Sequence, residues 1–218
     1  MKLKRWSEAN DPKHVALSLT GEPTFYPKMG KLIKSFHKRG ISTFLVTNGT
    51  LPEAIERIDP LPTQLYISMQ APDEDTYIKI TRPKVKHTWE RFRKSLELMS
   101  RLKTRTVLRM TLIKGLNMLN PEGYAELIKL AKPNYVEVKG FSFVGGAREP
   151  QRGLSLESMP KHEEIKEFAS KLAGLTGYID TAEHRPSRIV LLCRDTESRD
   201  SRIIDFDKIG KEYMAAYA

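Results

Sequence analysis

Cysteine is almost absent from this sequence of 218 residues. The single cysteine, Cys193, lies in the apolar run Ile189–Cys193, so no disulfide can form within the chain, and we expect a buried, inert thiol. An iron–sulfur cluster normally needs several thiolates. One cysteine therefore excludes a cluster held by this chain alone, and the sequence offers no metal-ligating group.

Long hydrophobic runs are also missing. No apolar stretch approaches the ~20 residues that span a bilayer, and no basic-then-apolar leader opens the chain. Hydrophobic residues make up 39% of the sequence and charged residues 29%, so global disorder is not expected. We expect a soluble, cytoplasmic protein with no membrane partner.

Acidic residues are in deficit. Lys and Arg outnumber Asp and Glu by 37 to 27, which gives a net charge of +10. Such an excess attracts polyanions and favours nucleic-acid binding, although an ordinary basic protein has the same composition. A basic helix predicted over residues 88–102 is a candidate nucleic-acid surface, and its alternative interpretation is a solvated helix face. The basic residues of this surface are Lys84, Lys86, Arg91, Arg93, Lys94, Arg101 and Lys103, and the nucleic-acid-binding candidates among them are Arg91, Arg93, Lys94, Arg101 and Lys103.

Short apolar segments alternate with helical patterns along most of the chain. The predicted strands cover residues 14–19, 41–46, 64–69, 107–113, 135–138 and 188–192, and helices are predicted between them. This alternation predicts an α/β fold with a parallel sheet and right-handed crossovers, as in a βα barrel. We expect one barrel domain over residues 1–195 and a C-terminal tail over residues 196–218.

Small, polar or glycine residues follow five consecutive predicted strands. In a βα barrel, ligands bind where the strands end, so these residues predict a ligand site. Each also has a structural explanation. Asn48-Gly49 is typical of a turn, Glu137 and Lys139 share a strand face and could form an ion pair, and Arg109 could be a salt-bridge partner.

The segment Thr20-Gly21-Glu22-Pro23 resembles the glycine-glycine-glutamate-proline turn of the radical S-adenosylmethionine (SAM) superfamily, with Thr20 in place of the first glycine. That turn holds the methionine amino group of the cofactor. The resemblance implies a partial TIM-like (βα)6 barrel, with Ser68 and Gln70 near the ribose and methionyl parts of SAM and Asn117 near the adenosyl part. The implied cofactor-binding residues are Thr20, Gly21, Glu22, Pro23, Thr47, Asn48, Ser68, Gln70, Arg109 and Asn117.

Within that superfamily, the chain resembles the tRNA 4-demethylwyosine synthases. The segments that carry this resemblance are residues 12–24, Ser68-Met69-Gln70-Ala71-Pro72, Arg109-Met110-Thr111-Leu112 and Glu137-Val138-Lys139-Gly140-Phe141. The family condenses N1-methylguanosine-37 in the anticodon loop of tRNA-Phe with pyruvate, and it uses SAM and a [4Fe-4S] cluster. The resemblance implies a lyase-class tRNA-modification enzyme of wybutosine biosynthesis. Lys139 is the candidate for a Schiff base with pyruvate, because an amine condenses with a carbonyl.

The C-x3-C-x2-C motif that anchors the family's cluster does not occur in this sequence. We therefore expect the chain to lack the family's first strand and cluster loop and to be inactive alone. It is either a truncated form of the enzyme or a non-catalytic tRNA- or SAM-binding module. A third reading, an unrelated aldolase that uses Lys139, leaves the Thr20-Gly21-Glu22-Pro23 turn unexplained. We expect a monomer.

Overall fold

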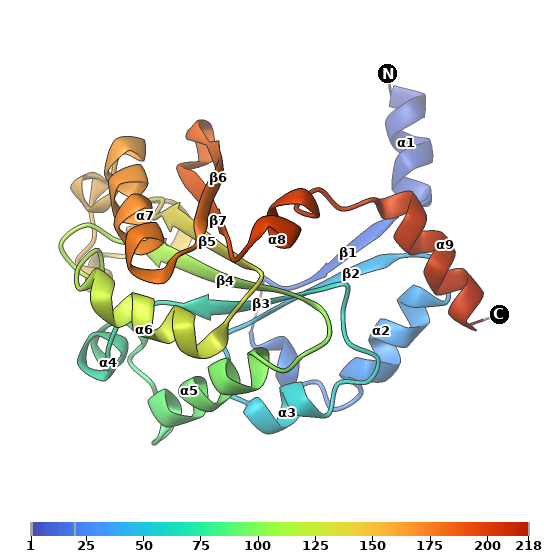
Figure 1. Ribbon diagram of the computed structural model, residues 1–218, viewed down its shortest axis with the longest axis horizontal. Helices are drawn as coiled ribbons and strands as arrows, with labels where there is room; N and C mark the ends of the chain where they lie inside the picture. Colours follow the sequence, from blue (N-terminus) through green and yellow to red (C-terminus); the bar gives the residue numbers. More distant parts are fainter. Residues whose placement is uncertain (1, 20, 218) are drawn as a thin grey trace.

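The computed structural model describes residues 2–19 and 21–217, which fold around one seven-stranded sheet (Figure 1). The strand order is β1-β2-β3-β4-β5-β7-β6. Strands β1 to β5 pair in parallel, and β7 pairs antiparallel with both β5 and β6. The strands are β1 (His14–Leu17), β2 (Ser42–Thr47), β3 (Gln64–Met69), β4 (Arg105–Leu112), β5 (Tyr135–Gly140), β6 (Ile179–His184) and β7 (Ile189–Cys193).

The expectation of a purely parallel sheet is wrong at its last strand. The segment predicted over residues 188–192 is a strand, but it runs antiparallel because it follows β6 through a tight turn that contains only η5 (Arg185–Ser187). A parallel connection needs a crossover of a dozen or more residues, and none is present there. The sequence analysis missed β6 because it is an exposed, mostly polar edge strand.

A layer of helices covers one face of the sheet (Figure 1). Alternate strand residues such as Leu45, Ile67, Met110 and Val138 are buried against it, as the period of two in a strand requires. The helices of the core side are α2 (Met29–His37), α3 (Pro52–Glu56), α4 (Glu74–Thr81), α5 (Thr88–Met99), α6 (Pro121–Ala131) and α7 (His162–Thr176). Short 3-10 turns are η1 (Pro23–Phe25), η2 (Gly145–Arg148), η3 (Pro150–Arg152) and η4 (Leu156–Ser158).

The other face of the sheet has no such helix layer and is called the open face below. Only its amino-terminal end is covered, by the chain after β7, which contains α8 (Thr196–Asp200) and α9 (Phe206–Tyr217) (Figure 1). Tyr135 donates a hydrogen bond of 3.0 Å to the Ser198 carbonyl oxygen, and Phe206 packs on His14 with ring centroids 4.0 Å apart. The tail thus contacts the sheet.

Helix α1 (Lys2–Asn10) projects from the sheet beside α9 (Figure 1). Among the described residues, no helix is both long enough and apolar enough to cross a membrane. Cys193 is buried, as predicted, and burial raises the pKa of its thiol.

Candidate ligand-binding site at the strand ends

The loop after β1 is tied to the end of β2 by the Glu22 carboxylate. Its Oε1 accepts hydrogen bonds from the Thr24 amide (3.1 Å), the Thr24 hydroxyl (2.6 Å) and the Thr47 hydroxyl (2.6 Å). Its Oε2 accepts a hydrogen bond of 2.8 Å from the Asn48 amide. These four bonds fix the carboxylate within the loop, so the Glu22 side chain sets the shape of the loop.

The backbone of this loop is open to a ligand. Gly21 has a φ of +77°, and no heavy atom lies within 4 Å of the position that a Cβ would occupy there. Pro23 begins η1, where its fixed φ suits a first turn. The Gly21 carbonyl has no hydrogen-bond partner among the described residues. Thr20, also predicted to bind the cofactor, lies outside the described residues.

The turn after β2 is built for a close approach. Asn48 Oδ1 accepts hydrogen bonds from the Thr50 amide (2.9 Å) and hydroxyl (2.7 Å), which leaves its Nδ2 donors unused by described residues. Gly49 has a φ of +72°, and a Cβ there would lie 2.9 Å from Ile67 Cγ2. The Ser95 hydroxyl of α5 holds the Gly49 carbonyl at 2.6 Å. The turn that Asn48-Gly49 predicts is confirmed, and Asn48 is exposed at its edge.

Ser68 and Gln70 follow at the end of β3. Ser68 is paired with Arg109 of β4 and belongs to the open face, by alternation with the buried Ile67 and Met69. The side chains of Ser68 and Gln70 make no hydrogen bond with a described residue, and both are half-buried. They are polar groups available to a ligand at the same end as Gly21 and Asn48.

Asn117 links the ends of β3 and β4. Its side chain is buried, Nδ2 donates to the carbonyl oxygens of Gln70 (2.8 Å) and Thr111 (2.9 Å), and Oδ1 accepts from the Ile113 amide at 2.6 Å. Asn117 thus fixes the ends of β3 and β4 relative to each other. Its bond to the Gln70 carbonyl oxygen holds the backbone of Gln70 in place.

Arg109 and Glu137 form an ion pair across β4 and β5 on the open face. Arg109 Nη2 donates to Glu137 Oε2 at 3.0 Å, and the guanidinium lies 4.5 Å from the centroid of the Tyr66 ring. Burial and the Glu137 charge raise the pKa of Tyr66, with burial the larger cause. The alternative pairing of Glu137 with Lys139 is therefore wrong, because Glu137 turns to Arg109 instead.

Lys139 follows two positions after Glu137, on the same face of β5. Its register partner is Thr111, one step diagonally from Arg109. Its amine has no hydrogen-bond or ion-pair partner among the described residues, and the side chain is half-buried. Two cations and one carboxylate thus share this part of the open face, which leaves it with a net positive charge.

Residues predicted to bind nucleic acid lie on the outer side of the helix layer. Arg91 is occupied, since its Nε donates to the Thr50 carbonyl oxygen at 2.8 Å and its Nη2 lies 3.2 Å from Glu53. Arg93 and Lys94 are exposed on α5, whereas Arg101 and Lys103 lie beyond its carboxyl end. Arg91 thus lies beside the turn after β2, whereas Arg101 and Lys103 lie at the opposite end of α5.

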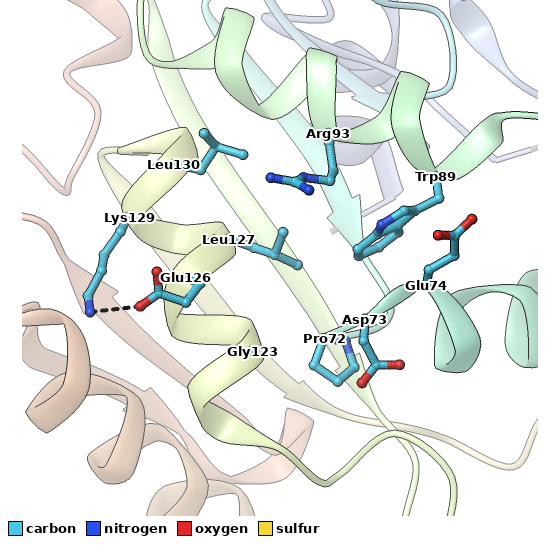
Figure 2. Close-up of a pocket in the computed structure, with 10 residues that line it drawn as sticks. All are labelled: Pro72, Asp73, Glu74, Trp89, Arg93, Gly123, Glu126, Leu127, Lys129 and Leu130. Atoms are coloured by element: carbon cyan, nitrogen blue, oxygen red, sulfur yellow. Dashed lines mark hydrogen bonds and ion pairs between the residues drawn. The ribbon is translucent and has the colours of Figure 1, made fainter.

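A groove of about 540 Å³ opens between α5 and α6, also on the outer side (Figure 2). Trp89, Leu127 and Leu130 line it, and the Arg93 side chain points into it (Figure 2). None of the strand-end residues lines this groove. It is therefore separate from the predicted ligand site.

Groups that could hold an iron–sulfur cluster are lacking in the described part of the chain. Residues 2–19 and 21–217 contain no cluster of three or more His, Cys, Asp or Glu side chains suited to a metal ion. Cys193 pairs with Tyr135 at the start of β5, so it lies at the opposite end of the sheet from Gly21 and Asn48. The residues present do not fit a [4Fe-4S] cluster.

Comparisons with known proteins agree with this fold. Residues 1–131 match the profile of the radical SAM superfamily, and residues 130–194 match that of wyosine base formation. The first match covers more than half of the chain, which therefore belongs to the radical SAM superfamily. Relatives that the chain resembles are named tRNA 4-demethylwyosine synthases.

Two relatives illustrate the range of similarity. The S-adenosyl-L-methionine-dependent tRNA 4-demethylwyosine synthase of Pyrococcus abyssi is 51% identical over 196 residues, which cover 88% of this chain and 56% of the relative. The Homo sapiens enzyme TYW1 is 38% identical, with 88% of this chain and 26% of the relative covered. The chain thus spans about half the length of the archaeal relative.

Solved structures give the same grouping. A structure of TYW1 with a lysine-pyruvate adduct bound superposes with a TM-score of 0.78 at 40% identity, over 88% of this chain and 60% of that one. A crystal structure of archaeal TYW1 gives a TM-score of 0.73 at 36% identity, over 94% and 63%. The likeness confirms the predicted family and the partial barrel.

Sequence reasoning missed Tyr66 and Thr24 as site residues. The Arg109 guanidinium lies over the Tyr66 ring. The buried Thr24 donates its hydroxyl hydrogen bond to the Glu22 carboxylate. Alternation along β3 places Tyr66 on the same face as Ser68, so that signal was present in the sequence. For Thr24 no pattern pointed to the role.

Proposed function

We propose that this chain forms the SAM- and substrate-binding part of a tRNA 4-demethylwyosine synthase. The reaction would join N1-methylguanosine-37 of tRNA-Phe to two carbons of pyruvate. The observation that carries the proposal is the Glu22 carboxylate, which joins the loop after β1 to Thr47 and Asn48 at the end of β2. This arrangement holds an open glycine loop against the strand ends, where a parallel α/β barrel binds its ligand.

The polar groups around this loop fit the amino acid and ribose parts of SAM. The Gly21 carbonyl suits an ammonium group, and the Asn48, Ser68 and Gln70 side chains have unused donors and acceptors at the same end of the sheet. SAM held here would supply hydrogen-abstracting chemistry only where a reducing cluster is provided from outside the described residues. The chain itself offers no fit for that cluster, so its own residues bind and orient the reactants.

Lys139 and Arg109 suit pyruvate. The Lys139 amine, once neutral, attacks the carbonyl carbon of pyruvate, a C–N bond forms, and water leaves as the imine is completed. Arg109 Nη1 has no partner among the described residues and lies one diagonal step away, where it can bind the pyruvate carboxylate. The lysine-pyruvate adduct in the TYW1 structure supports an imine for the family, and Lys139 is this chain's candidate for it.

A non-catalytic SAM- or tRNA-binding module is the second candidate. The observation in its favour is that the described residues hold no set of cluster ligands. Both candidates use the strand-end site, and for both we propose a cytoplasmic setting, a monomeric chain and a barrel domain over residues 1–195. The two candidates differ in whether bound pyruvate and SAM react. An activity assay on a full-length protein distinguishes them.

SAM binding is tested by isothermal titration calorimetry on the chain. We expect Gln70→Ala to weaken binding by about tenfold, the equivalent of one hydrogen bond of about 1.4 kcal/mol. Gln151→Ala is the matched control, because Gln151 lies exposed in η3 and its side chain donates to Glu149. Equal affinity for both variants, or no binding to the parent chain, would contradict the SAM site.

The imine is tested by borohydride reduction in the presence of pyruvate, followed by peptide mass spectrometry. We expect one reduced pyruvyl group on Lys139, and none in Lys139→Arg. Lys114→Arg is the control. Lys114 lies in the loop after β4 and forms an ion pair with Glu164 of α7. Labelling spread over several lysines would remove Lys139 from this role and leave the SAM site untouched.

A further inference from the structure

The segment from Lys79 to Lys86, at the end of α4 and in the loop to α5, is densely cationic. It contains Lys79, Arg82, Lys84 and Lys86, and all four are exposed. None forms an ion pair with a described acidic residue, although Glu74 and Asp75 lie on the same helix. We propose that this segment is the surface that binds the phosphate backbone of the RNA substrate. This proposal rests on the proposed function.

Several exposed cations elsewhere in the chain are neutralised locally. Lys129 pairs with Glu126 at 3.0 Å, and Lys171 pairs with Glu167 at 2.9 Å. On α5, Arg91 pairs with Glu53. The α4–α5 segment differs from these paired positions because none of its four cations forms an ion pair with a described acidic residue, although Glu74 lines the same hollow as Lys84 and Lys86. Unpaired cations of this kind release counterions when they meet a polyanion.

The position of the segment relates it to the ligand site. Helix α4 follows the end of β3 directly after Gln70, and the first half of α5 contacts the end of β2 through Arg91 and Ser95. At the other end of α5, the Thr104 hydroxyl donates to the Pro62 carbonyl oxygen before β3. Helix α5 thus runs antiparallel to the strands, and the basic loop lies at the carboxyl end of the sheet (Figure 1).

This geometry favours the loop over the distal end of α5. Arg101 and Lys103 lie where the strands begin, so a polyanion bound there would be far from Gly21 and Asn48. A backbone bound by Lys84 and Lys86 would instead run along the rim of the strand-end site. Exposed Val85 and Ile78 lie among the cations and offer apolar contacts to ribose or base. Phosphate contacts of this type fix register without reading sequence.

The test compares two charge-matched double variants. Lys84→Gln/Lys86→Gln removes two charges from the loop, and Arg101→Gln/Lys103→Gln removes two charges from the distal end of α5. Binding of a tRNA-Phe transcript is measured by fluorescence anisotropy at several salt concentrations. All four residues are exposed, and far-UV circular dichroism on heating checks that both variants fold like the parent.

We expect the loop variant to bind the transcript roughly tenfold more weakly near 0.1 M salt and to lower the slope of log K against log[salt] by about 1.5 to 2. The distal variant should keep the parent's slope. Equal losses in both variants, no loss in the loop variant, or no binding of tRNA by the parent would each overturn the proposal. So would loop-dependent binding to phosphatidylserine vesicles in the absence of loop-dependent RNA binding.

SAM binding by the same two variants separates this proposal from the function on which it rests. The affinity for SAM should be unchanged in both, because neither pair contacts the strand-end residues. If the parent binds RNA through the loop but does not bind SAM, the proposed function fails while the RNA surface stands. If SAM binds and the loop variant keeps full RNA affinity, the surface fails alone.

Discussion

The Thr47 hydroxyl donates a hydrogen bond of 2.6 Å to the carboxylate of Glu22, 25 residues earlier in the chain. Because Thr47 is the last residue of β2, this bond joins two parallel strand ends through side chains. The same carboxylate receives the Thr24 hydroxyl at 2.6 Å and the Asn48 amide at 2.8 Å. The loop that would hold a ligand is thus set by one acidic residue.

We predict that Glu22→Gln lowers the free energy of unfolding by about 1 to 3 kcal/mol. The amide presents one acceptor and one donor group, so it cannot satisfy the donors on both sides of the carboxylate. Urea denaturation measures the change. Glu149→Gln, at an exposed position in the loop after β5, serves as the control and should stay within about 0.5 kcal/mol of the parent. Equal stability of the two variants would show that the Glu22 bonds contribute little.

The ion pair between Arg109 and Glu137 supplies the second prediction. The side chains are 31% and 14% exposed, so the pair is partly shielded from water. A double-mutant cycle with Arg109→Met and Glu137→Gln should give a coupling energy of about 1 to 2 kcal/mol. The exposed pair of Lys208 and Glu212, 4.0 Å apart, should give no resolvable coupling in a matched cycle. The reverse ranking would contradict the role of burial.

The parallel part of the sheet could be predicted from the sequence because each strand there is apolar and each crossover carries a helical stripe. The strand Gln64–Met69 has the bounds that the sequence predicts. Strand β6 is not predicted, because its residues are polar and exposed. The direction of β7 relative to β5 could not be predicted either, because an apolar run has the same pattern in either direction. The tight turn before Ile189 sets the antiparallel direction of β7.

The positions of the site residues could be predicted, but their partners could not. Strand ends placed Asn48 and Gln70 correctly at one end of the sheet. That Glu137 pairs with Arg109 and not with Lys139 depends on the register of β4 against β5, which the sequence does not contain. Asn117 likewise bonds to backbone carbonyls that only the fold brings near it.

The third prediction concerns pH and His37, which is buried between α2 and α9. Its Nε2 lies 2.8 Å from the Thr43 hydroxyl, and its ring stacks on Tyr213 with centroids 3.8 Å apart. Burial lowers the pKa of His37 from 6.5 to about 4. Between these values the unfolded chain binds more protons than the folded one, so stability is full above pH 6.5 and falls as the pH drops toward 4.

Chemical denaturation at a series of pH values from 7.5 to 4.5 checks this dependence, which amounts to about 1.4 kcal/mol per pKa unit of difference. His37→Gln should flatten the part of the curve below pH 6.5. His184→Gln, at an exposed site, should leave the curve unchanged. A parent curve that is as flat as the His37→Gln curve would mean that His37 accepts a proton without opening the α2–α9 contact.

Cys193 provides the fourth prediction, on reactivity. Since the side chain is buried and burial raises the pKa of the thiol, little thiolate is present or reachable in the folded chain. A disulfide reagent such as DTNB should label the folded protein far more slowly than the denatured protein. Cys193→Ala gives the blank. Fast labelling of the folded form would show that β7 opens readily.

The last prediction concerns iron and uses the same residue. Anaerobic reconstitution of this chain with iron and sulfide should give no stable cluster absorbance, because one buried thiol at the amino-terminal end of β5 cannot supply the thiolates that a cluster needs. Cys193→Ala should behave like the parent, which separates this outcome from iron bound loosely at the surface. If the parent forms a cluster at a ratio of one per several chains and Cys193→Ala does not, copies of the chain must bring their Cys193 residues together around it. That result would overturn the monomeric arrangement as well.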